Sequence, residues 1–379
     1  MLNKYNIKSL INSTFILGNI SCDLDSFLSS ILLSLSKNIL NNNYNNFNYY
    51  FPLINCKREE LKYRFDIDYL IKRFGINTKN MLFIDDKIIK YLLKKNNFNL
   101  ILVDHNNFDI SQKNLFNKWK ISEIYDHHKD EKLNIKNKNI IYPLGSCTTL
   151  ILNKFFLPNP FLLNYIHPLL SISAILTDTE NFNKDIYNKR WVDLDKNVYD
   201  FILNYSKLNY NFDEKFLNKF YLDLNKEKYS KEKNLNLGIN GILFKDKKNY
   251  KWNKNILAGI STIQIKIEKI FKKFGMESII NEINKICKKE NNNIYIICYN
   301  DKINKNKCKS FILFNYNLNQ KNFNLLINDL KKILNNKCLK IENISHNKIK
   351  FYVDNSISRK HFEPIIKNLF NNNKYNLIK

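Results

Sequence analysis

The stretch Ile124-Tyr125-Asp126-His127-His128-Lys129 places two adjacent histidines directly after an aspartate, where a short apolar run ends. A second run of this kind, Leu102-Val103-Asp104-His105-Asn106, also ends in an acid and an imidazole, although the whole chain has only six histidines. Further upstream, the mostly apolar residues 14–18 precede Asp23 and Asp25. Short apolar runs bounded by turn residues are typical of buried strands. Each run therefore predicts a strand that delivers polar side chains at its carboxyl end.

A fourth apolar run, residues 173–176, leads to Asp178 and is likewise expected to be a strand. Between the runs, the spacing of apolar residues predicts helices at 25–40, 66–74 and 87–95. Strands that alternate with helices predict an α/β domain with a mostly parallel sheet. Ligands of such sheets bind at the carboxyl ends of the strands, so the four polar clusters are expected to share one site.

The length of 379 residues exceeds what one hydrophobic core usually supports, so the sequence predicts two domains. We expect a first domain at 1–205, a linker region at 206–235 and a second, smaller α/β domain at 236–379. Strands of the second domain are expected at 241–244, 256–263, 294–299, 310–314 and 348–353, and its helices at 265–274, 276–289 and 323–333.

The net charge and the cysteines indicate which kind of binding partner and which cellular compartment to expect. The formal net charge of +26 favours a polyanionic partner such as polyphosphate, nucleic acid or an anionic membrane, although lysine and asparagine are abundant throughout the chain. Seven scattered cysteines without a CxxC pair, and first residues unlike a signal peptide, predict reduced thiols in a cytoplasmic protein. The most apolar segment, 160–176, contains Asn164 and His167, and we expect it to be a buried helix that leads into a strand rather than a membrane span.

Aspartates and neutral histidines with few thiolates suit hard or borderline divalent cations such as Mn²⁺, Mg²⁺ or Co²⁺. Asp23 and Asp25 can point in opposite directions from an extended loop and so serve two ions, which Asp104 could bridge. Two ions about 3.5–4 Å apart can share a hydroxide and hold an in-line displacement at phosphorus. Taken alone, the Asp-x-Asp pair is a common turn sequence, and Asp126 could simply orient a neighbouring imidazole. The joint occurrence of the clusters favours a shared metal site.

The loop Gly145-Ser146-Cys147-Thr148-Thr149 precedes an apolar segment, 150–156, that is expected to be helical. Glycine and hydroxyl residues at the start of a helix can cap it, or present hydroxyls and amides to a phosphate. Capping is the commoner role of such a loop. Ser146 is the candidate for the second role.

Five motifs in order along the chain resemble those of the DHH phosphoesterase superfamily. They are Gly18-Asn19-x3-Asp23-Leu24-Asp25-Ser26, Val103-Asp104-His105-Asn106, Asp126-His127-His128, Gly145-Ser146-Cys147-Thr148-Thr149 and Leu176-Thr177-Asp178-Thr179. Asn19, where family II pyrophosphatases carry a histidine, is similar to the exopolyphosphatase/prune branch, as is Asp104-His105-Asn106. Asp126-His127-His128 favours the exopolyphosphatase side, because prune-type proteins tend to carry Asp-His-Arg there.

The second half of the chain resembles the DHHA2 domain of the same branch. The resemblance rests on Phe244-Lys245-Asp246-Lys247-Lys248, Gly259-Ile260-Ser261-Thr262-Ile263 and Ser358-Arg359-Lys360 with Pro364. The alternative DHHA1 domain should carry a glycine-rich substrate motif, and this chain has seven glycines in all and no such run.

The resemblance implies a role for each motif residue, with two divalent metal ions, Mn²⁺ or Mg²⁺ and also Co²⁺, as cofactors. The implied metal ligands are Asp23, Asp25, Asp104, His127 and Asp178. His128 would lie against the substrate phosphate or the leaving group, with Asp126 behind it, and Asn19 would occupy a ligand position that an amide fills weakly. Arg359 and Lys360 would reach substrate phosphates across a domain cleft, and Lys245 is a weaker candidate for the same task.

The function implied is a metal-dependent exopolyphosphatase that removes the terminal phosphate of inorganic polyphosphate with a hydroxide activated by two metal ions. One alternative keeps the site but hydrolyses pyrophosphate, short polyphosphates or cyclic nucleotides. Another is a regulatory protein that binds a polyanion with little turnover. Nucleic acid is the less favoured partner, because no RRM, KH or OB pattern accompanies the basic and aromatic runs.

Overall fold

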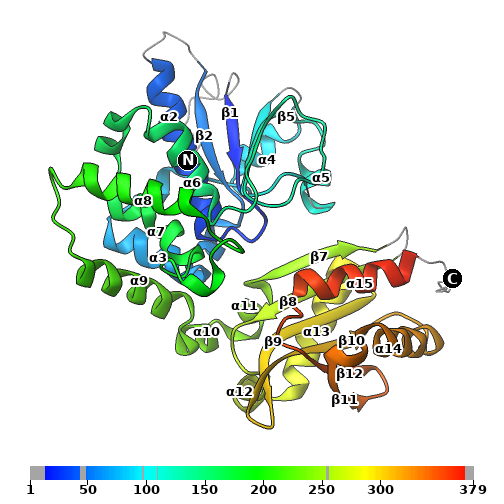
Figure 1. Cartoon of the computed structure of the whole chain (residues 1–379). Coiled ribbons are helices and arrows are strands. Elements are labelled where there is room, and N and C mark those ends of the chain that lie inside the picture. The colour runs from blue at the N-terminus through cyan, green and yellow to red at the C-terminus, as the bar shows by residue number, and fades with distance from the viewer. Residues whose placement is uncertain (1–12, 43–47, 96–97, 109, 253–255, 372–379) are drawn as a thin grey trace. The chain divides into compact units, whose positions relative to one another are not determined.

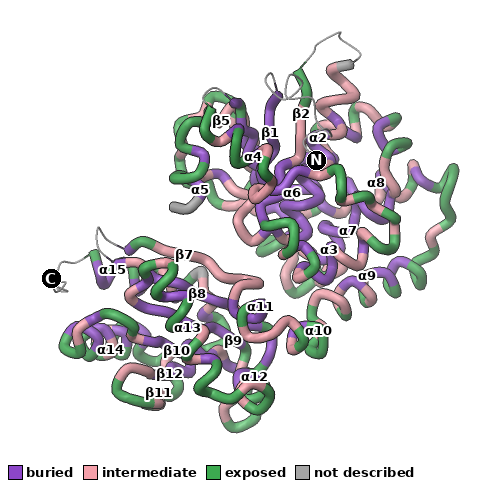
Figure 2. Tube along the Cα trace, turned by 180° about the vertical axis from the view of Figure 1, so that it is seen from behind, coloured by how far each residue is buried: buried purple, intermediate pink, exposed green. Residues whose placement is uncertain are grey.

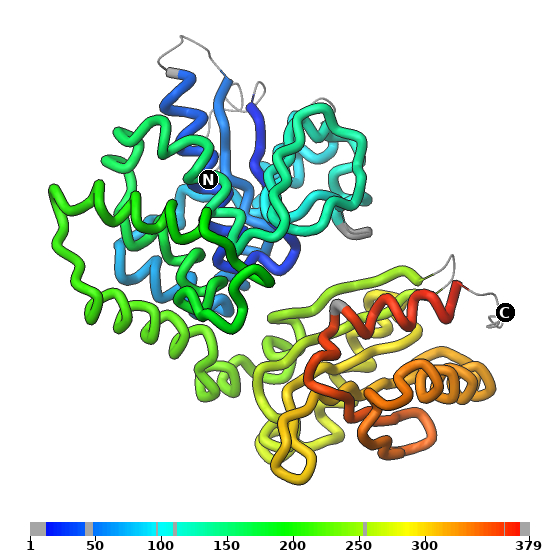
Figure 3. Tube along the Cα trace, in the orientation of Figure 1, coloured from blue at the N-terminus to red at the C-terminus, as the bar shows by residue number. Residues whose placement is uncertain are grey.

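The structure is a computed structural model that describes residues 13–42, 48–95, 98–108, 110–252 and 256–371. The chain divides into two compact units, Met1–Lys228 and Tyr229–Lys379. Figure 1 labels most of their elements, and Figure 3 follows the chain from blue to green through the first unit and on to red through the second. The division falls inside the segment 206–235, and the domain boundaries expected from the sequence stay a prediction.

The first unit is built on a parallel sheet of six strands in the order β3-β2-β1-β4-β5-β6. The strands are β1 Thr14–Leu17, β2 Tyr50–Ile54, β3 Leu82–Phe83, β4 Asn99–Val103, β5 Lys120–Asp126 and β6 Asn137–Ile140. The first strand lies in the middle, because Thr14 pairs with both Tyr50 and Asn99. The expected α/β domain with a mostly parallel sheet is confirmed.

Helices cover both faces of this sheet. They are α2 Leu24–Asn42, α3 Phe65–Arg73, α4 Lys87–Leu92, α5 Ile110–Leu115, α6 Cys147–Ile151, α7 Pro168–Asp178, α8 Asp193–Ser206 and α9 Glu214–Lys228. Successive strand residues point to opposite faces, so Ile16 belongs to the core formed with α2, α6 and α7, whereas Phe15 and Leu17 belong to the core on the other face. Figure 2 shows β1 as a buried strand. The strand ends are therefore held rigidly from both sides.

The run at residues 173–176 is helical, and the strand expected there is wrong. It lies inside α7, which Pro168 opens at the first helical position and His167 caps through Nδ1, at 3.2 Å from the amide of Leu169. Every residue from Pro168 to Thr177 is buried. A helix that is apolar all round has no polar face, so its periodicity gives no signal in the sequence. Asp178 therefore lies at the carboxyl end of a helix and not of a strand.

The second unit contains a mixed sheet in the order β11-β12-β10-β9-β8-β7, in which only β8 and β9 are parallel. Its strands are β7 Lys247–Lys251, β8 Leu257–Ile263, β9 Ile294–Ile303, β10 Asn306–Asn315, β11 Cys338–Ser345 and β12 Lys348–Val353. Its helices are α10 Lys231–Asn236, α11 Gly238–Phe244, α12 Ile267–Phe274, α13 Met276–Glu290, α14 Gln320–Leu334 and α15 Arg359–Asn371. Two hydrophobic clusters flank this sheet, as expected of an α/β domain.

Parts of the second unit differ from the expectation, including helix α15, which was not predicted. The strand expected at 241–244 is part of helix α11, because four apolar residues fit either period equally well. The edge strands β7 and β11 were missed. Both carry lysines and half-exposed side chains, which is the usual composition of a protected sheet edge and resembles that of a loop.

Candidate active site

Asp104 lies at the carboxyl end of β4 and contacts residues from several of the predicted motifs. It is buried and adopts the left-handed backbone region, with φ of 60°, which aspartate tolerates better than most residues. Its Oδ2 accepts hydrogen bonds of 2.7 Å from the Asn19 amide and from the Ser26 hydroxyl. Its Oδ1 faces the His127 ring, with Nε2 at 3.1 Å. One oxygen is thus fixed by the protein and the other is presented to the site.

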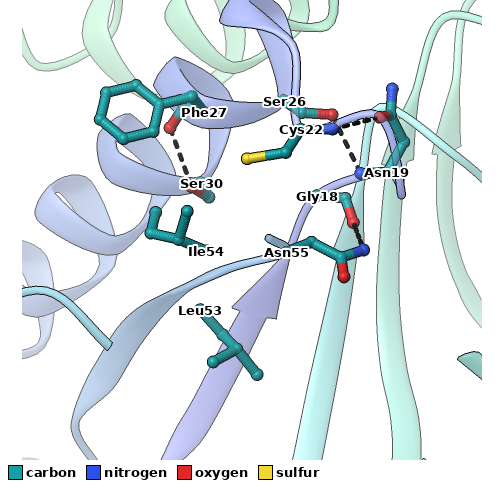
Figure 4. Close-up of a pocket in the computed structure, with 9 residues that line it drawn as sticks. All are labelled: Gly18, Asn19, Cys22, Ser26, Phe27, Ser30, Leu53, Ile54 and Asn55. Atoms are coloured by element: carbon teal, nitrogen blue, oxygen red, sulfur yellow. Dashed lines mark hydrogen bonds between the residues drawn. The ribbon is translucent and has the colours of Figure 1, made fainter. Parts of the chain in front are cut away.

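The loop between β1 and α2 presents Asn19 and Asp23. A Cβ at Gly18 would come within 2.8 Å of Ser26, so the loop can lie against the start of α2 only with glycine there. Figure 4 shows this packing, in which the backbone amide of Asn19 donates to the Ser26 hydroxyl at 2.9 Å. Burial alone would raise the pKa of Asp23, but hydrogen bonds from the Ser26 backbone and from Asn19 hold that pKa below its usual range. These hydrogen bonds therefore favour the ionised form of Asp23.

Asp25 is buried and is held by the loop that precedes α6. Its carboxylate accepts hydrogen bonds from the Ser146 hydroxyl at 2.6 Å, from the Cys147 amide at 2.7 Å and from the Thr148 amide at 2.8 Å. Ser146 also caps α6 by accepting from the Thr148 amide, so its hydroxyl is already used within the protein. The Oδ2 atom of Asp25 still lies 3.6 Å from Nε2 of His127. Asp25 and Asp104 thus approach the same imidazole.

The two adjacent histidines have different surroundings. Nδ1 of His127 lies 2.9 Å from the carbonyl oxygen of Leu144, which directs Nε2 toward the aspartates. Nδ1 of His128 lies 2.8 Å from Asp126, whose other carboxylate oxygen accepts from the Asn106 amide. The His127 side chain is 16% exposed and the His128 side chain 40% exposed. His127 therefore faces the buried acids, whereas His128 is oriented by Asp126 and reaches solvent.

These side chains can surround a cation. Ligand atoms of Asp104, Asp126, His127 and His128 all lie within 4.8 Å of one another. Asp178 is half-buried at the end of α7, and its buried Oδ2 has no hydrogen-bond partner in the part of the chain that the structure describes. Burial, with the charges of Asp25 and Asp23, raises its pKa to about 8. A buried carboxylate oxygen without a donor is costly unless a cation or a proton compensates it.

The pKa shifts in the cluster indicate that its carboxylates favour a bound cation. Burial and the neighbouring charges of Asp23 and Asp25 raise the pKa of Asp104 well above its usual range. Burial would lower the pKa of His127, but its contacts with Asp104 and Asp25 raise it instead. The nearby Cys147 offers no thiolate, since burial raises its pKa and its sulfur donates to the Tyr125 carbonyl. Carboxylate oxygens and imidazoles around uncompensated negative charge fit hard or borderline divalent cations.

The stability of the protein should therefore depend on pH and on metal together. A carboxyl whose pKa is raised by folding binds its proton more tightly in the folded state, so the metal-free protein should lose stability as the pH rises through about 8, the pKa of Asp178. A cation that replaces the proton should reverse this loss. Thermal unfolding with and without Mg²⁺ should show a larger metal-induced shift at high than at low pH, and Asp178→Asn should flatten both trends. An equal shift at both pH values would contradict the account.

Two of the residues expected to bind substrate in the second unit, Arg359 and Lys245, are hydrogen-bonded within that unit. Nη1 of Arg359 donates to the carbonyl oxygen of Asp246 at 3.0 Å and to its carboxylate at 2.8 Å, so two segments 113 residues apart meet. The ammonium group of Lys245 donates to the side chain of Asn234 at 2.9 Å. The side chain of Lys360 lies outside the described residues.

Three contributors to the site were not assigned a role from the sequence. Ser26 and Asn106 fall inside recognised motifs, and their hydrogen bonds to Asp104 and Asp126 appear only in the fold. Asp195 at the start of α8 was missed. In the sequence, Asp195 resembles an ordinary acid in the first turn of a helix, which bonds to the backbone amide of the residue three positions earlier, here Val192.

Two family models match the chain. The DHH family, N-terminal domain, matches residues 13–177, and the DHHA2 domain matches residues 228–369. The chain therefore carries a DHH family N-terminal domain followed by a DHHA2 domain. The resemblance seen in the sequence motifs is confirmed.

Individual relatives match over part of their length. A Schizosaccharomyces pombe protein named "Putative exopolyphosphatase" is 36% identical over 163 residues, which are 42% of this chain and 40% of that protein. The human protein named "Exopolyphosphatase PRUNE1" is 28% identical over 172 residues, which are 45% of this chain and 37% of that protein. The matched region thus spans less than half the length of either curated relative.

A solved structure shares the fold. The crystal structure of a Methanococcus jannaschii "putative family II inorganic pyrophosphatase" superposes with a TM-score of 0.56 at 18% identity, covering 95% of this chain and 99% of that one. Within the described ranges, no helix is both long enough and apolar enough to cross a bilayer. The cytoplasmic location expected from the sequence stays a prediction.

Proposed function

We propose that this chain is a metal-dependent hydrolase of phosphoric anhydrides, and that its substrate is inorganic polyphosphate, from which it releases the terminal phosphate. The observation that carries the proposal is the convergence of Asp104, Asp126, His127 and His128 within 4.8 Å. The names of the fission yeast and human relatives, which describe exopolyphosphatases, support the choice of substrate.

The proposed metal ligands are Asp23, Asp25, Asp104, His127 and Asp178, and the proposed cofactors are two Mn²⁺ or Mg²⁺ ions. Two such ions, when bound, supply an activated water and neutralise charge that develops on the phosphoryl group. The chain contributes the geometry. The Leu144 carbonyl fixes the His127 ring so that Nε2 faces the aspartates, and the Asn19 and Ser26 donors hold Asp104 in place.

His128 and Asp126 form the proposed acid that protonates the departing chain. Asp126 is fully buried, and His128 and Asn106 hold its pKa low against the effect of burial. A carboxylate that stays ionised orients the imidazole through Nδ1 and leaves Nε2 for the substrate. Asn19 is assigned the remaining catalytic position, where its amide orders the carboxylates.

Substrate binding is assigned to Arg359, Lys360 and Lys245. The Ser146 hydroxyl, the fourth candidate from the sequence, instead holds Asp25. Arg359 is held by Asp246 through one nitrogen of its guanidinium, and a fork of five donors can bind phosphate oxygens while keeping that contact. The net charge of +26 would attract a long polyanion.

The experiment that tests the proposal measures phosphate release from long-chain polyphosphate, tripolyphosphate, pyrophosphate and cyclic AMP, each with Mn²⁺ and with Mg²⁺. We expect the highest kcat/KM on long-chain polyphosphate. Faster turnover of pyrophosphate or cyclic AMP would show that the protein is a hydrolase, but that polyphosphate is not its preferred substrate. Inactivity on all four, together with tight binding of polyphosphate, would overturn the hydrolase in favour of a polyanion-binding protein.

A further inference from the structure

Asp195 is fully buried near the start of α8 and binds three donors from two parts of the chain. One is the amide of Val192 at 3.0 Å, within its own helix start. The other two are the amide of Gly145 at 2.9 Å and the hydroxyl of Thr149 at 2.6 Å, both in the segment before and inside α6. A helix cap accounts for the first bond alone.

The segment that Asp195 holds is the one that positions two proposed metal ligands. The carbonyl of Leu144 orients His127, and the Ser146 hydroxyl with the amides of Cys147 and Thr148 holds Asp25. The two residues bonded to Asp195, Gly145 and Thr149, stand next to these groups in the sequence. A displacement of the segment would therefore move His127 and Asp25 together.

The contact between this segment and Asp195 leaves no free space. A Cβ at Gly145 would meet Oδ1 of Asp195 at 2.9 Å and a methyl carbon of Thr179 at 2.9 Å. The close approach lets the Gly145 amide reach the carboxylate directly. An acid buried completely in a chain rich in exposed lysine and asparagine also needs a local reason, since burial of a charge is costly without bonded partners.

We infer that Asp195 is a positioning residue for the metal site: it fixes the segment 144–149 so that His127 and Asp25 present their ligand atoms in the geometry that a divalent cation requires. The inference rests on the proposed metal ligands of the hydrolase. Partners that orient metal ligands without touching the metal typically change metal affinity by about 10–100-fold when they are removed.

The test uses the full chain and compares Asp195→Asn, Thr149→Val and Thr149→Ser. Asp195→Asn replaces the carboxylate, which accepts from three donors, by a neutral amide with a single acceptor oxygen. Thr149→Val removes only the bond from the Thr149 hydroxyl and leaves the bond from the Val192 amide intact. Thr149→Ser restores the hydroxyl. The control is Asp193→Asn, since Asp193 lies in the same helical turn and is exposed. Each variant is titrated with Mn²⁺ by calorimetry, and its metal-free thermal unfolding is recorded.

We expect Asp195→Asn and Thr149→Val to weaken Mn²⁺ binding by about 10–100-fold, with Thr149→Ser and Asp193→Asn close to the unmodified protein. If Asp195→Asn does not fold, the contrast between Thr149→Val and Thr149→Ser decides. Unchanged Mn²⁺ affinity in Thr149→Val, with only a lower unfolding temperature, would overturn the inference and leave Asp195 as a structural residue. Because Mn²⁺ binding is measured directly, the result is independent of which phosphate compound the protein hydrolyses.

Discussion

Asp104→Asn is expected to lower the rate of phosphate release by more than about 100-fold, because losing even an indirect partner of a metal ligand costs about 10–100-fold. Asparagine keeps the shape of the side chain and tolerates the left-handed backbone at this position. Its neutral amide cannot supply the charge that a cation needs from the central residue of the site. Mn²⁺ affinity, measured by calorimetry, should fall together with the rate.

The same variant should make the metal-free protein more stable. The pKa of Asp104 is raised by burial and by Asp23 and Asp25, so its ionised form destabilises the fold at neutral pH, and asparagine removes that repulsion. Thermal unfolding should therefore shift upward without metal, while the stabilisation by Mn²⁺ should be lost. Asp130→Asn is the matched control, because Asp130 is an exposed aspartate that pairs with Lys138. If Asp104→Asn still binds Mn²⁺ and releases phosphate, Asp104 is not a metal ligand.

His128→Gln is expected to lower kcat by about 100-fold or more, the usual contribution of a positioned proton donor. Mn²⁺ binding should change little, because Nδ1 of His128 is bonded to Asp126 and its ring is half-exposed, whereas His127 faces the buried acids. Rates at saturating polyphosphate and Mn²⁺ titrations of the same preparation separate the two effects.

The control for this substitution is His346→Gln, at an exposed histidine in the turn between β11 and β12. A large loss of Mn²⁺ affinity in His128→Gln would make His128 a metal ligand instead of a proton donor, since its ligand atom lies within the same 4.8 Å cluster. An unchanged kcat would exclude both roles.

The sequence predicted the centre of the site because parallel strands end at one edge of a sheet. Asp104 follows β4 and Asp126 ends β5, and these strands are neighbours, so two motifs more than 20 residues apart were expected to meet. The prediction failed for the element that carries Asp178, since α7 is buried on all sides and has no polar face.

Other parts of the site leave no trace in the sequence. The Leu144 carbonyl orients His127 with a backbone atom, which any residue could supply. Asp195 acts on residues 46 and 50 positions away, and its own surroundings read as an ordinary helix start. Among the described residues no donor reaches Oδ2 of Asp178, and this is visible only when its neighbours are in place. Side-chain chemistry can be predicted from motifs, whereas backbone contacts and packing require the fold.

The most direct measurement of the central claim is phosphate release from long-chain polyphosphate by protein freed of metal and then titrated with Mn²⁺. We expect no release without metal, and a rate that rises to a plateau as two equivalents of Mn²⁺ bind, with Asp104→Asn inactive throughout. Release that is independent of added metal, or that is equal in Asp104→Asn, would contradict the claim.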